Sequence, residues 1–204
     1  FGDVYAGYLA KKMGLPINKL IVATNQNDIL HRAISKGIYE VEKVVETISP
    51  SMDIQIASNF ERLIYDLNNG DDSQTVSAMN DIKEKGKYIL DQKKLDKINN
   101  NFLSSKISED EVLKTIEQVY KKFDVVLDPH SAIGYGAFDK VNISGHNIVL
   151  ATAHPCKFPD AIKNAINLNA ELPKELMYIL NEKENYEIID NDIVKVKKHI
   201  KERI

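Results

Sequence analysis

Short apolar runs alternate along the chain with stretches in which apolar residues recur at helical spacing. The apolar runs are residues 20–25, 125–127 and 147–152, and each predicts a buried strand. The stretches between them, of which residues 108–123 are the clearest, predict amphipathic helices. Strands that alternate with helices favour an α/β fold with a doubly wound, mainly parallel sheet flanked by helices.

Capping and stop signals predict where several helices begin and end. The first helical pattern is stopped by residues 14–16, Gly-Leu-Pro, and a second pattern over residues 29–35 is stopped by Gly37. Ser108 and Glu111 have the spacing of a capping box, in which each side chain bonds the backbone N–H of the other residue. A helix is therefore predicted to begin directly after Ser108.

Two parts of the chain differ from this alternating pattern. Residues 68–105 are rich in Asn, Asp, Lys and Gln with scattered apolar positions, which predicts a peripheral helical insertion. Residues 191–204 predict a basic terminal helix with one apolar face, made by Ile193, Val196, Ile200 and Ile204. The lysines of this helix are expected to form a solvated face.

Length and composition narrow the class of protein. The 204 residues suit one domain or slightly more, and 43% hydrophobic residues are too many for a disordered chain. A net charge of −3 with mixed signs gives no electrostatic footprint for nucleic acid. No stretch approaches the roughly 20 apolar residues of a membrane span. The single Cys156 cannot form an internal disulfide, which favours a reducing, cytoplasmic location.

The opening of the chain is unusual. The first residue, Phe1, is not an initiator Met, and no basic-then-apolar signal segment follows it. The chain begins with Phe1-Gly2-Asp3 and enters a helical pattern at once. This opening predicts a fragment of a longer polypeptide.

Three polar loops follow the predicted strands directly. They are residues 24–28, 128–131 and 152–157. Ligands of an open parallel sheet bind beyond the carboxyl ends of its strands. The three loops are therefore expected to contribute to one binding site.

The helix start at Phe1-Gly2-Asp3 is a further candidate, for an anion. Glycine allows close backbone approach, and the free N–H groups and the dipole of a helix N-terminus favour phosphate. The alternative is an ordinary helix in which Asp3 caps the first turn.

Two other polar groups also have a binding interpretation and an ordinary one. Residues 49–53, Ser-Pro-Ser-Met-Asp, could bind a polar ligand or form the turn that caps a helix near Ser58. Arg32 lies four residues after Asp28, the spacing of an exposed ion pair on one helix face.

The loop after the third predicted strand carries a hydroxyl, an imidazole, a thiol and an amine, at Thr152, His154, Cys156 and Lys157. A Cys–His nucleophile pair is a weak alternative, because the spacing is not diagnostic and no third partner is visible. Scattered histidines and a single cysteine argue against a zinc site. His130 and His154 are expected to bond the loops in which they lie.

Several segments, taken together and in order, resemble the C-terminal half of the threonine synthase family, in the longer form found in many bacteria and fungi. The resemblance covers nearly the whole chain. The segments are Phe1-Gly2-Asp3 (the end of a Gly-Asn-Phe-Gly-Asp motif), Lys12-Met13-Gly14-Leu15-Pro16, Ile21-Val22-Ala23-Thr24-Asn25 with Asn27, Asp28 and Arg32, Ser49-Pro50-Ser51-Met52-Asp53-Ile54, Ser58-Asn59-Phe60-Glu61-Arg62, Asp128-Pro129-His130, and Ala151-Thr152-Ala153-His154-Pro155 with Lys157-Phe158-Pro159.

The resemblance implies a pyridoxal 5'-phosphate enzyme of the tryptophan-synthase-β-like fold, fold type II. The family converts O-phospho-L-homoserine and water to L-threonine and phosphate, in the last step of threonine biosynthesis. Residues 1–204 would then be the C-terminal part of the cofactor-binding catalytic domain. The missing N-terminal half of the same polypeptide would be their partner, and neither nucleic acid nor a membrane is implied.

The resemblance also assigns roles by motif. It places Phe1, Gly2 and Asp3 in the loop that holds the cofactor phosphate, and Thr152 at the pyridine nitrogen. A neutral hydroxyl cannot hold that nitrogen protonated as a carboxylate would. The positions expected to bind or support the substrate, the last of them through the substrate's phosphate, are Asn27, Asp28, Arg32, Ser51 and Lys157.

The chain departs from the family pattern in two positions and lacks one residue. Cys156 stands where the family often has a small residue, and Ser131 stands where threonine is common. Neither abolishes an assigned role. The Schiff-base lysine of the family lies in a Ser-Phe-Lys-Asp-like motif that residues 1–204 do not contain. No catalytic residue is therefore assigned in this chain, which is expected to be inactive alone.

Two alternative functions remain open. Another enzyme of the same cofactor fold could carry out β-replacement or dehydration, although residues 49–53 and 151–155 argue against it. A non-catalytic module of the same fold could bind phosphate-bearing metabolites or complete a partner chain. The missing lysine favours that module, and the truncated opening motif argues against it.

Overall fold

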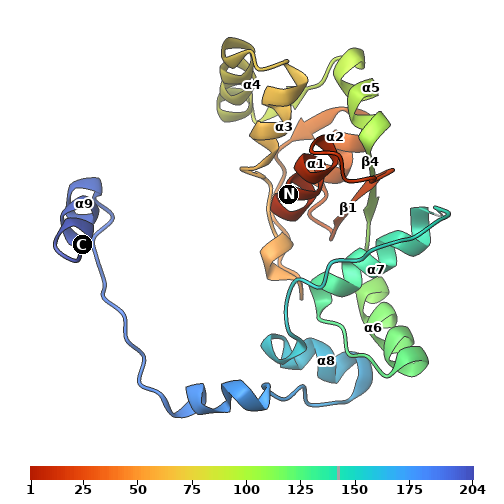
Figure 1. Cartoon of the computed structure of the whole chain (residues 1–204), viewed down its shortest axis with the longest axis vertical. Helices are drawn as coiled ribbons and strands as arrows, with labels where there is room; N and C mark the ends of the chain where they lie inside the picture. Colours follow the sequence, from red (N-terminus) through yellow and green to blue (C-terminus); the bar gives the residue numbers. More distant parts are fainter. Residues whose placement is uncertain (142) are drawn as a thin grey trace. The chain divides into compact units, whose positions relative to one another are not determined.

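The structure is a computed structural model that describes residues 1–141 and 143–204. These residues form two units, Phe1–Ala170 and Glu171–Ile204. The first unit contains both hydrophobic clusters and all strands of the described residues (Figure 1). Its elements, in chain order, are α1 (Gly2–Lys12), β1 (Leu20–Thr24), α2 (Ile29–Lys36), β2 (Ile38–Glu40), η1 (Pro50–Met52), α3 (Phe60–Leu67), α4 (Asp72–Lys85), β3 (Lys87–Ile89), α5 (Gln92–Asn101), β4 (Phe102–Lys106), α6 (Glu109–Phe123), α7 (Pro129–Val141), η2 (Pro155–Lys157) and α8 (Pro159–Ile166).

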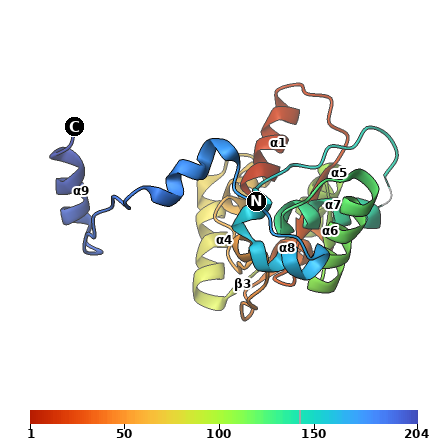
Figure 2. The ribbon, with the colours of Figure 1, turned by 90° about the horizontal axis from the view of Figure 1, so that it is seen from below.

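Strand β1 lies at the centre of the first unit and pairs in parallel with β4. Successive side chains of a strand point to opposite faces, so β1 contributes to two hydrophobic clusters. Leu20 and Val22 pack with α1, α2 and α3, whereas Ile21 and Ala23 pack with α6, α7 and α8. Figure 1 shows these two groups of helices, and Figure 2 shows α6, α7 and α8 from below. The strand predicted over residues 20–25 is confirmed, and so is the α/β class with a parallel pair flanked by helices.

The other two predicted strands are wrong. Residues 125–127 and 147–152 belong to no strand in the described parts of the chain, and Val125 and Ile148 are 48% and 86% exposed. An apolar run does not reveal whether a hydrogen-bonded partner lies beside it, and a strand requires one. The parallel partner of β1 is β4, Phe-Leu-Ser-Ser-Lys, which carries little apolar signal.

The predicted helix boundaries are confirmed at three places. Helix α1 ends at Lys12, two residues before Gly14. Helix α2 ends at Lys36 and is capped by Gly37, whose φ of 71° is the left-handed conformation that glycine adopts readily. Ser108 caps α6 as predicted: the Glu111 carboxylate accepts the Ser108 N–H at 2.8 Å, and Ser108 Oγ accepts the Glu111 N–H at 3.4 Å. All three signals act within one helical turn, and the tertiary structure keeps the helix boundaries that they predict.

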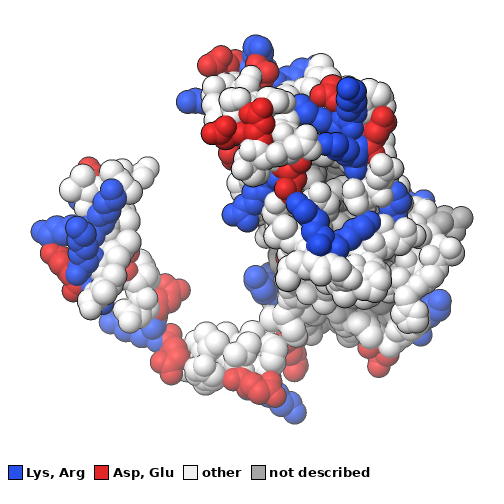
Figure 3. All heavy atoms as spheres, turned by 45° about the horizontal axis from the view of Figure 1, so that its top comes forward, with Lys and Arg blue, Asp and Glu red and all other residues white. Residues whose placement is uncertain are grey.

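Residues 68–105, predicted to be a peripheral helical insertion, contain α4 and α5 but also β3 and most of β4. Strand β3 pairs antiparallel with β2, and β4 completes the central parallel pair. The polar composition of this stretch comes from the exposed faces of its two helices. Figure 3 shows acidic and basic side chains interspersed over this part of the surface.

Two glycines of α7 lie where this helix approaches its neighbours. A Cβ atom at Gly136 would lie 3.2 Å from Thr115 Oγ1, and that hydroxyl is held by a 2.8 Å hydrogen bond to the Glu111 carbonyl. A Cβ atom at Gly134 would lie 3.2 Å from Val149 Cγ1, on a segment outside any strand. The first neighbour is fixed, and the second can shift.

Alanine at these two positions should therefore have different effects on stability. We expect Gly136→Ala to lower the free energy of unfolding by about 1–2 kcal/mol, because overpacking exceeds the gain in helix propensity. Gly134→Ala should change it by less than about 0.5 kcal/mol, since the helical gain offsets a small shift of the segment. Urea denaturation of the two variants measures the difference, and equal losses would contradict this account.

The second unit contains η3 (Lys174–Asn181) and α9 (Ile193–Lys201). Asp192 caps α9 by accepting the N–H groups of Val194 at 2.7 Å and Lys195 at 3.1 Å. Arg203 Nη2 contacts both carboxylate oxygens of Glu187 at 2.7 Å. The predicted terminal helix is confirmed. In the described parts of both units, no helix combines the length and hydropathy needed to cross a membrane.

Candidate functional site

A network of amides, hydroxyls and one carboxylate follows the carboxyl end of β1. Asp53 Oδ1 accepts hydrogen bonds from Asn25 Nδ2 at 2.7 Å and from Asn27 Nδ2 at 2.9 Å. The same carboxylate accepts the Thr47 hydroxyl at 2.7 Å and the Thr47 N–H at 2.9 Å. Asn25 also donates to Ser49 Oγ at 2.9 Å. The side chains of both asparagines are therefore bound to protein groups and fix the shape of this edge of the sheet.

Asp28 and Arg32 form an ion pair, as their spacing predicted, but the pair is not exposed: the two side chains are 15% and 12% exposed. Arg32 Nε donates to Asp28 Oδ1 at 2.9 Å, and Lys106 Nζ donates to Asp28 Oδ2 at 3.0 Å. Burial would raise the pKa of the Asp28 carboxyl, but the hydrogen bonds from Lys106 and Arg32 hold that pKa below its usual value. Arg32 also donates to the Glu40 carbonyl at 2.8 Å. The pair thus joins the start of α2 to β4 and β2.

Three other predicted ligand-binding residues have free side chains. Ser51, Thr152 and Lys157 are exposed, and their side chains form no hydrogen bond or ion pair within residues 1–141 and 143–204. Ser51 lies in η1 and Lys157 in η2. These three side chains therefore differ from those of Asn27, Asp28 and Arg32, which are bound to other groups of the protein. The binding roles themselves stay predictions.

The start of α1 fits a phosphate group. Phe1 occupies the N-cap position and makes no side-chain capping bond, so Asp3 does not cap the helix as the alternative interpretation required. The N–H groups of the first turn have no partner within an α-helix. A Cβ atom at Gly2 would lie 3.2 Å from Asn59 Nδ2, so glycine keeps this position open. Free N–H groups, the helix dipole and a nearby amide suit an anion.

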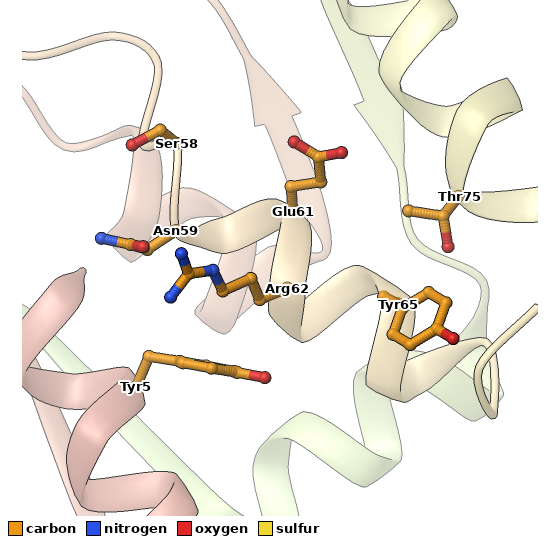
Figure 4. Close-up of a pocket in the computed structure, with 7 residues that line it drawn as sticks. All are labelled: Tyr5, Ser58, Asn59, Glu61, Arg62, Tyr65 and Thr75. Atoms are coloured by element: carbon orange, nitrogen blue, oxygen red, sulfur yellow. The ribbon is translucent and has the colours of Figure 1, made fainter. Parts of the chain in front are cut away.

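A shallow pocket of about 460 Å³ lies between α1 and α3. Figure 4 shows the side chains of Asn59 and Arg62 turned toward the space beside Tyr5 of α1. Arg62 forms no ion pair within the described residues, and the Tyr5 hydroxyl donates to Asp66 Oδ2 at 3.2 Å. The residues that line this pocket are Tyr5, Ser58, Asn59, Glu61, Arg62, Tyr65 and Thr75.

The residue before α7 carries a buried carboxylate, that of Asp128, which is 1% exposed. Asp128 Oδ1 accepts the His130 N–H at 2.9 Å and lies 3.0 Å from His130 Nδ1, and Asp128 Oδ2 accepts the Ser131 hydroxyl. Ser131 Oγ in turn accepts the N–H of Thr152 at 3.1 Å. His130 therefore bonds its own loop, as predicted, and His154 does the same by accepting the Cys156 N–H at 3.2 Å.

Sequence reasoning missed several members of these networks. Thr47 was not predicted to take part. Ser49 and Ser131 were considered as members of polar segments with a possible binding role, not as hydrogen-bond partners of Asn25 and Thr152. The bond from Ser131 to Asp128 spans only three positions, but other bonds of these networks join residues 6 to 28 positions apart, as in Thr47–Asp53, Asn25–Asp53 and Ser131–Thr152. No local spacing rule covers such pairs.

Among the residues that the structure describes, no group of three His, Cys, Asp or Glu could hold a metal ion.

Comparison with known proteins adds to this geometry. Residues 131–200 match the family profile described as "Threonine synthase, C-terminal". The threonine synthase of Pseudomonas aeruginosa is 39% identical over 199 residues, which cover 96% of this chain and 42% of that protein. The threonine synthase of Saccharomyces cerevisiae is 39% identical over 231 residues, which cover 100% of this chain and 45% of that protein.

Two solved structures share the fold at high similarity. A pyridoxal-phosphate-bound threonine synthase from Brucella melitensis superposes with a TM-score of 0.89 and 43% identity, over 99% of this chain and 44% of that structure. The threonine synthase from yeast gives a TM-score of 0.83 and 38% identity, over 99% of this chain and 45% of that structure. The chain therefore spans less than half the length of these relatives.

Proposed function

Because the chain belongs to the threonine synthase family and corresponds to the C-terminal part of its members, we propose that the full-length protein converts O-phospho-L-homoserine and water to L-threonine and phosphate. The observation that carries this proposal is the similarity to a pyridoxal-phosphate-bound threonine synthase over 99% of the chain, at a TM-score of 0.89. Pyridoxal phosphate would supply the electron sink of the reaction.

In this proposal the chain provides two parts of the cofactor site. The free N–H groups at the start of α1 bind the cofactor phosphate, and Gly2 keeps that approach open. The exposed hydroxyl of Thr152 meets the pyridine nitrogen. Because the hydroxyl is neutral, it tunes the ring more gently than a carboxylate would. The lysine that holds the cofactor lies outside residues 1–204.

Substrate recognition divides between free and supporting side chains. The exposed amine of Lys157 and the hydroxyl of Ser51 are available to bind the substrate, with Lys157 at its phosphate. Asn27, Asp28 and Arg32 support the same edge of the sheet through their bonds to neighbouring groups.

Activity of the full-length protein tests the proposed function directly. Given O-phospho-L-homoserine, the purified protein with bound cofactor should release phosphate and form an equal amount of threonine. Phosphate release without threonine would favour a relative that carries out a different replacement or elimination. A protein that binds the cofactor and does neither would contradict the proposal.

The chain of residues 1–204, tested by itself, should be inactive. Incubation with pyridoxal phosphate followed by borohydride reduction should label surface lysines at low and scattered occupancy, measured by mass spectrometry. Stoichiometric labelling of one lysine would show that this chain contains its own cofactor-binding lysine.

Replacing Thr152 by valine in the full-length enzyme should reduce kcat by about tenfold, the effect of losing one hydrogen bond of about 1.4 kcal/mol. Affinity for the cofactor should change less, because the start of α1 anchors the phosphate separately. Steady-state kinetics and cofactor titration measure the two quantities, and Thr152→Ser should retain more activity because it keeps the hydroxyl. Unchanged kinetics in Thr152→Val would show that the assigned role is misplaced.

A further inference from the structure

We propose that Ser131 is a positioning residue for the cofactor ring, because its hydroxyl ties the backbone of Thr152 to the buried carboxylate of Asp128. This inference rests on the proposed function, in which the Thr152 hydroxyl meets the pyridine nitrogen. Ser131 itself touches neither substrate nor cofactor in this account. It acts by fixing the residue that does.

The Ser131 hydroxyl donates one hydrogen bond and accepts another. A serine hydroxyl donates one hydrogen bond and can accept two. The Ser131 hydroxyl donates to Asp128 Oδ2, and Ser131 Oγ accepts the N–H of Thr152 at 3.1 Å. The bond to the carboxylate therefore orients a lone pair of Ser131 toward the backbone of Thr152.

The carboxylate at the other end of this chain of bonds is itself fixed. Asp128 is 1% exposed and also accepts the N–H of His130 at 2.9 Å. Burial would raise the pKa of Asp128, but the hydrogen bonds from His130 and Ser131 hold that pKa below its usual value. Asp128 consequently stays ionised near neutral pH and can only accept, so the proton of Ser131 stays on Ser131.

Thr152 depends on this bond because little else holds its segment. Residues 147–152 belong to no strand of the described structure, so no ladder of backbone hydrogen bonds fixes them. Within the described residues, the bond from Thr152 N–H to Ser131 Oγ is the hydrogen bond that ties this segment to α7. Ser131 is 2% exposed, at the buried start of that helix. A rigid helix thus positions an otherwise weakly held loop residue.

The test uses the full-length protein with bound cofactor and three variants. Ser131→Ala removes the acceptor, and Ser131→Thr keeps a hydroxyl. Thr115→Val is the matched control: it removes another hydroxyl of the same region, 7% exposed, which bonds the Glu111 carbonyl and not Thr152. Each variant is measured for amide hydrogen exchange of the peptide containing Thr152, for the absorbance spectrum of the bound cofactor, and for kcat.

In Ser131→Ala we expect the Thr152 amide to exchange at least about tenfold faster and kcat to fall by about tenfold, the effect of one lost hydrogen bond. The cofactor spectrum should shift in the same direction as in Thr152→Val. Ser131→Thr should restore all three readouts, and Thr115→Val should leave them unchanged. Should Ser131→Ala not fold, Ser131→Cys, whose thiol is a weak hydrogen-bond donor and acceptor, should show the same changes in the same direction and at smaller size.

A double-mutant cycle separates positioning from a general structural role. Once Thr152→Val has removed the hydroxyl, adding Ser131→Ala should lower kcat little further, because the two residues act in series. An equal loss in both backgrounds, or a loss of kcat without faster exchange at Thr152, would overturn the inference. A wild-type protein that makes no threonine would instead refute the proposed function, and the exchange rates would still test the bond between Ser131 and Thr152.

Discussion

Replacing Asp53 by alanine is expected to lower the free energy of unfolding by about 3–5 kcal/mol, among the largest effects of any single change in this chain. The Asp53 carboxylate accepts four hydrogen bonds, from Asn25 Nδ2, Asn27 Nδ2, the Thr47 hydroxyl and the Thr47 N–H. Alanine leaves all four donors without this acceptor. Both asparagines are buried, at 2% and 3% exposure, so water cannot readily replace the carboxylate.

Urea denaturation of the full-length protein measures this loss. Asp53→Asn should have an intermediate effect, because one amide oxygen still accepts while the amide N–H₂ faces donors. The control is Asp139→Ala, at an exposed aspartate of α7 that forms no hydrogen bond within the described residues, and it should change stability by less than about 0.5 kcal/mol. Equal effects of Asp53→Ala and Asp139→Ala would show that the network does not stabilise the fold.

Replacing Phe60 by alanine should cost a similar amount, about 3–5 kcal/mol, for a different reason. Phe60 begins α3 and is 1% exposed. Its ring stacks on Tyr39, with centroids 5.0 Å apart and planes 5° apart, and meets Phe1 edge-on at 5.4 Å. Alanine would open a cavity among these rings and lose both aromatic contacts.

The comparison that isolates this packing lies on the same helix. Tyr65 is 45% exposed, so Tyr65→Ala should cost less than about 1 kcal/mol. Phe60→Leu should fall between the two alanine variants because leucine fills part of the space. If Phe60→Ala were no more destabilising than Tyr65→Ala, the cluster around α3 would not be part of the stabilising core.

The sequence was most informative where a structural signal is local. The capping box at Ser108 and Glu111, the stop at Gly37 and the Asp28–Arg32 pair each involve residues within four positions or a single residue, and all are present in the structure. The apolar run at residues 20–25 also predicted its strand correctly, because β1 is covered on both faces. Such signals depend on short-range geometry, which the order of residues specifies directly.

The same reasoning failed where a prediction needed to know the neighbour across space. Residues 147–152 are as apolar as β1. Of these two segments, only β1 pairs with another strand in the described structure, and the sequence of its partner β4 has few apolar residues. Polar residues showed the same limit. The sequence did not show that Ser49 and Asp53 bind Asn25, which lies 24 and 28 positions earlier in the chain. The ligand-binding role of Ser51, whose side chain is exposed, stays a prediction.

The order of residues specified the α/β class, several helix boundaries and, through ordered motifs, the resemblance to the threonine synthase family. It also predicted that the cofactor-binding lysine lies outside residues 1–204, which contain no Ser-Phe-Lys-Asp-like motif. The tertiary structure alone decided that β4 pairs with β1, that Asp53 holds Asn25 and Asn27, and that Ser131 holds Thr152. The physical reason is range: caps and helical periodicity act within a turn or two, whereas these contacts form only after the chain has brought distant residues together.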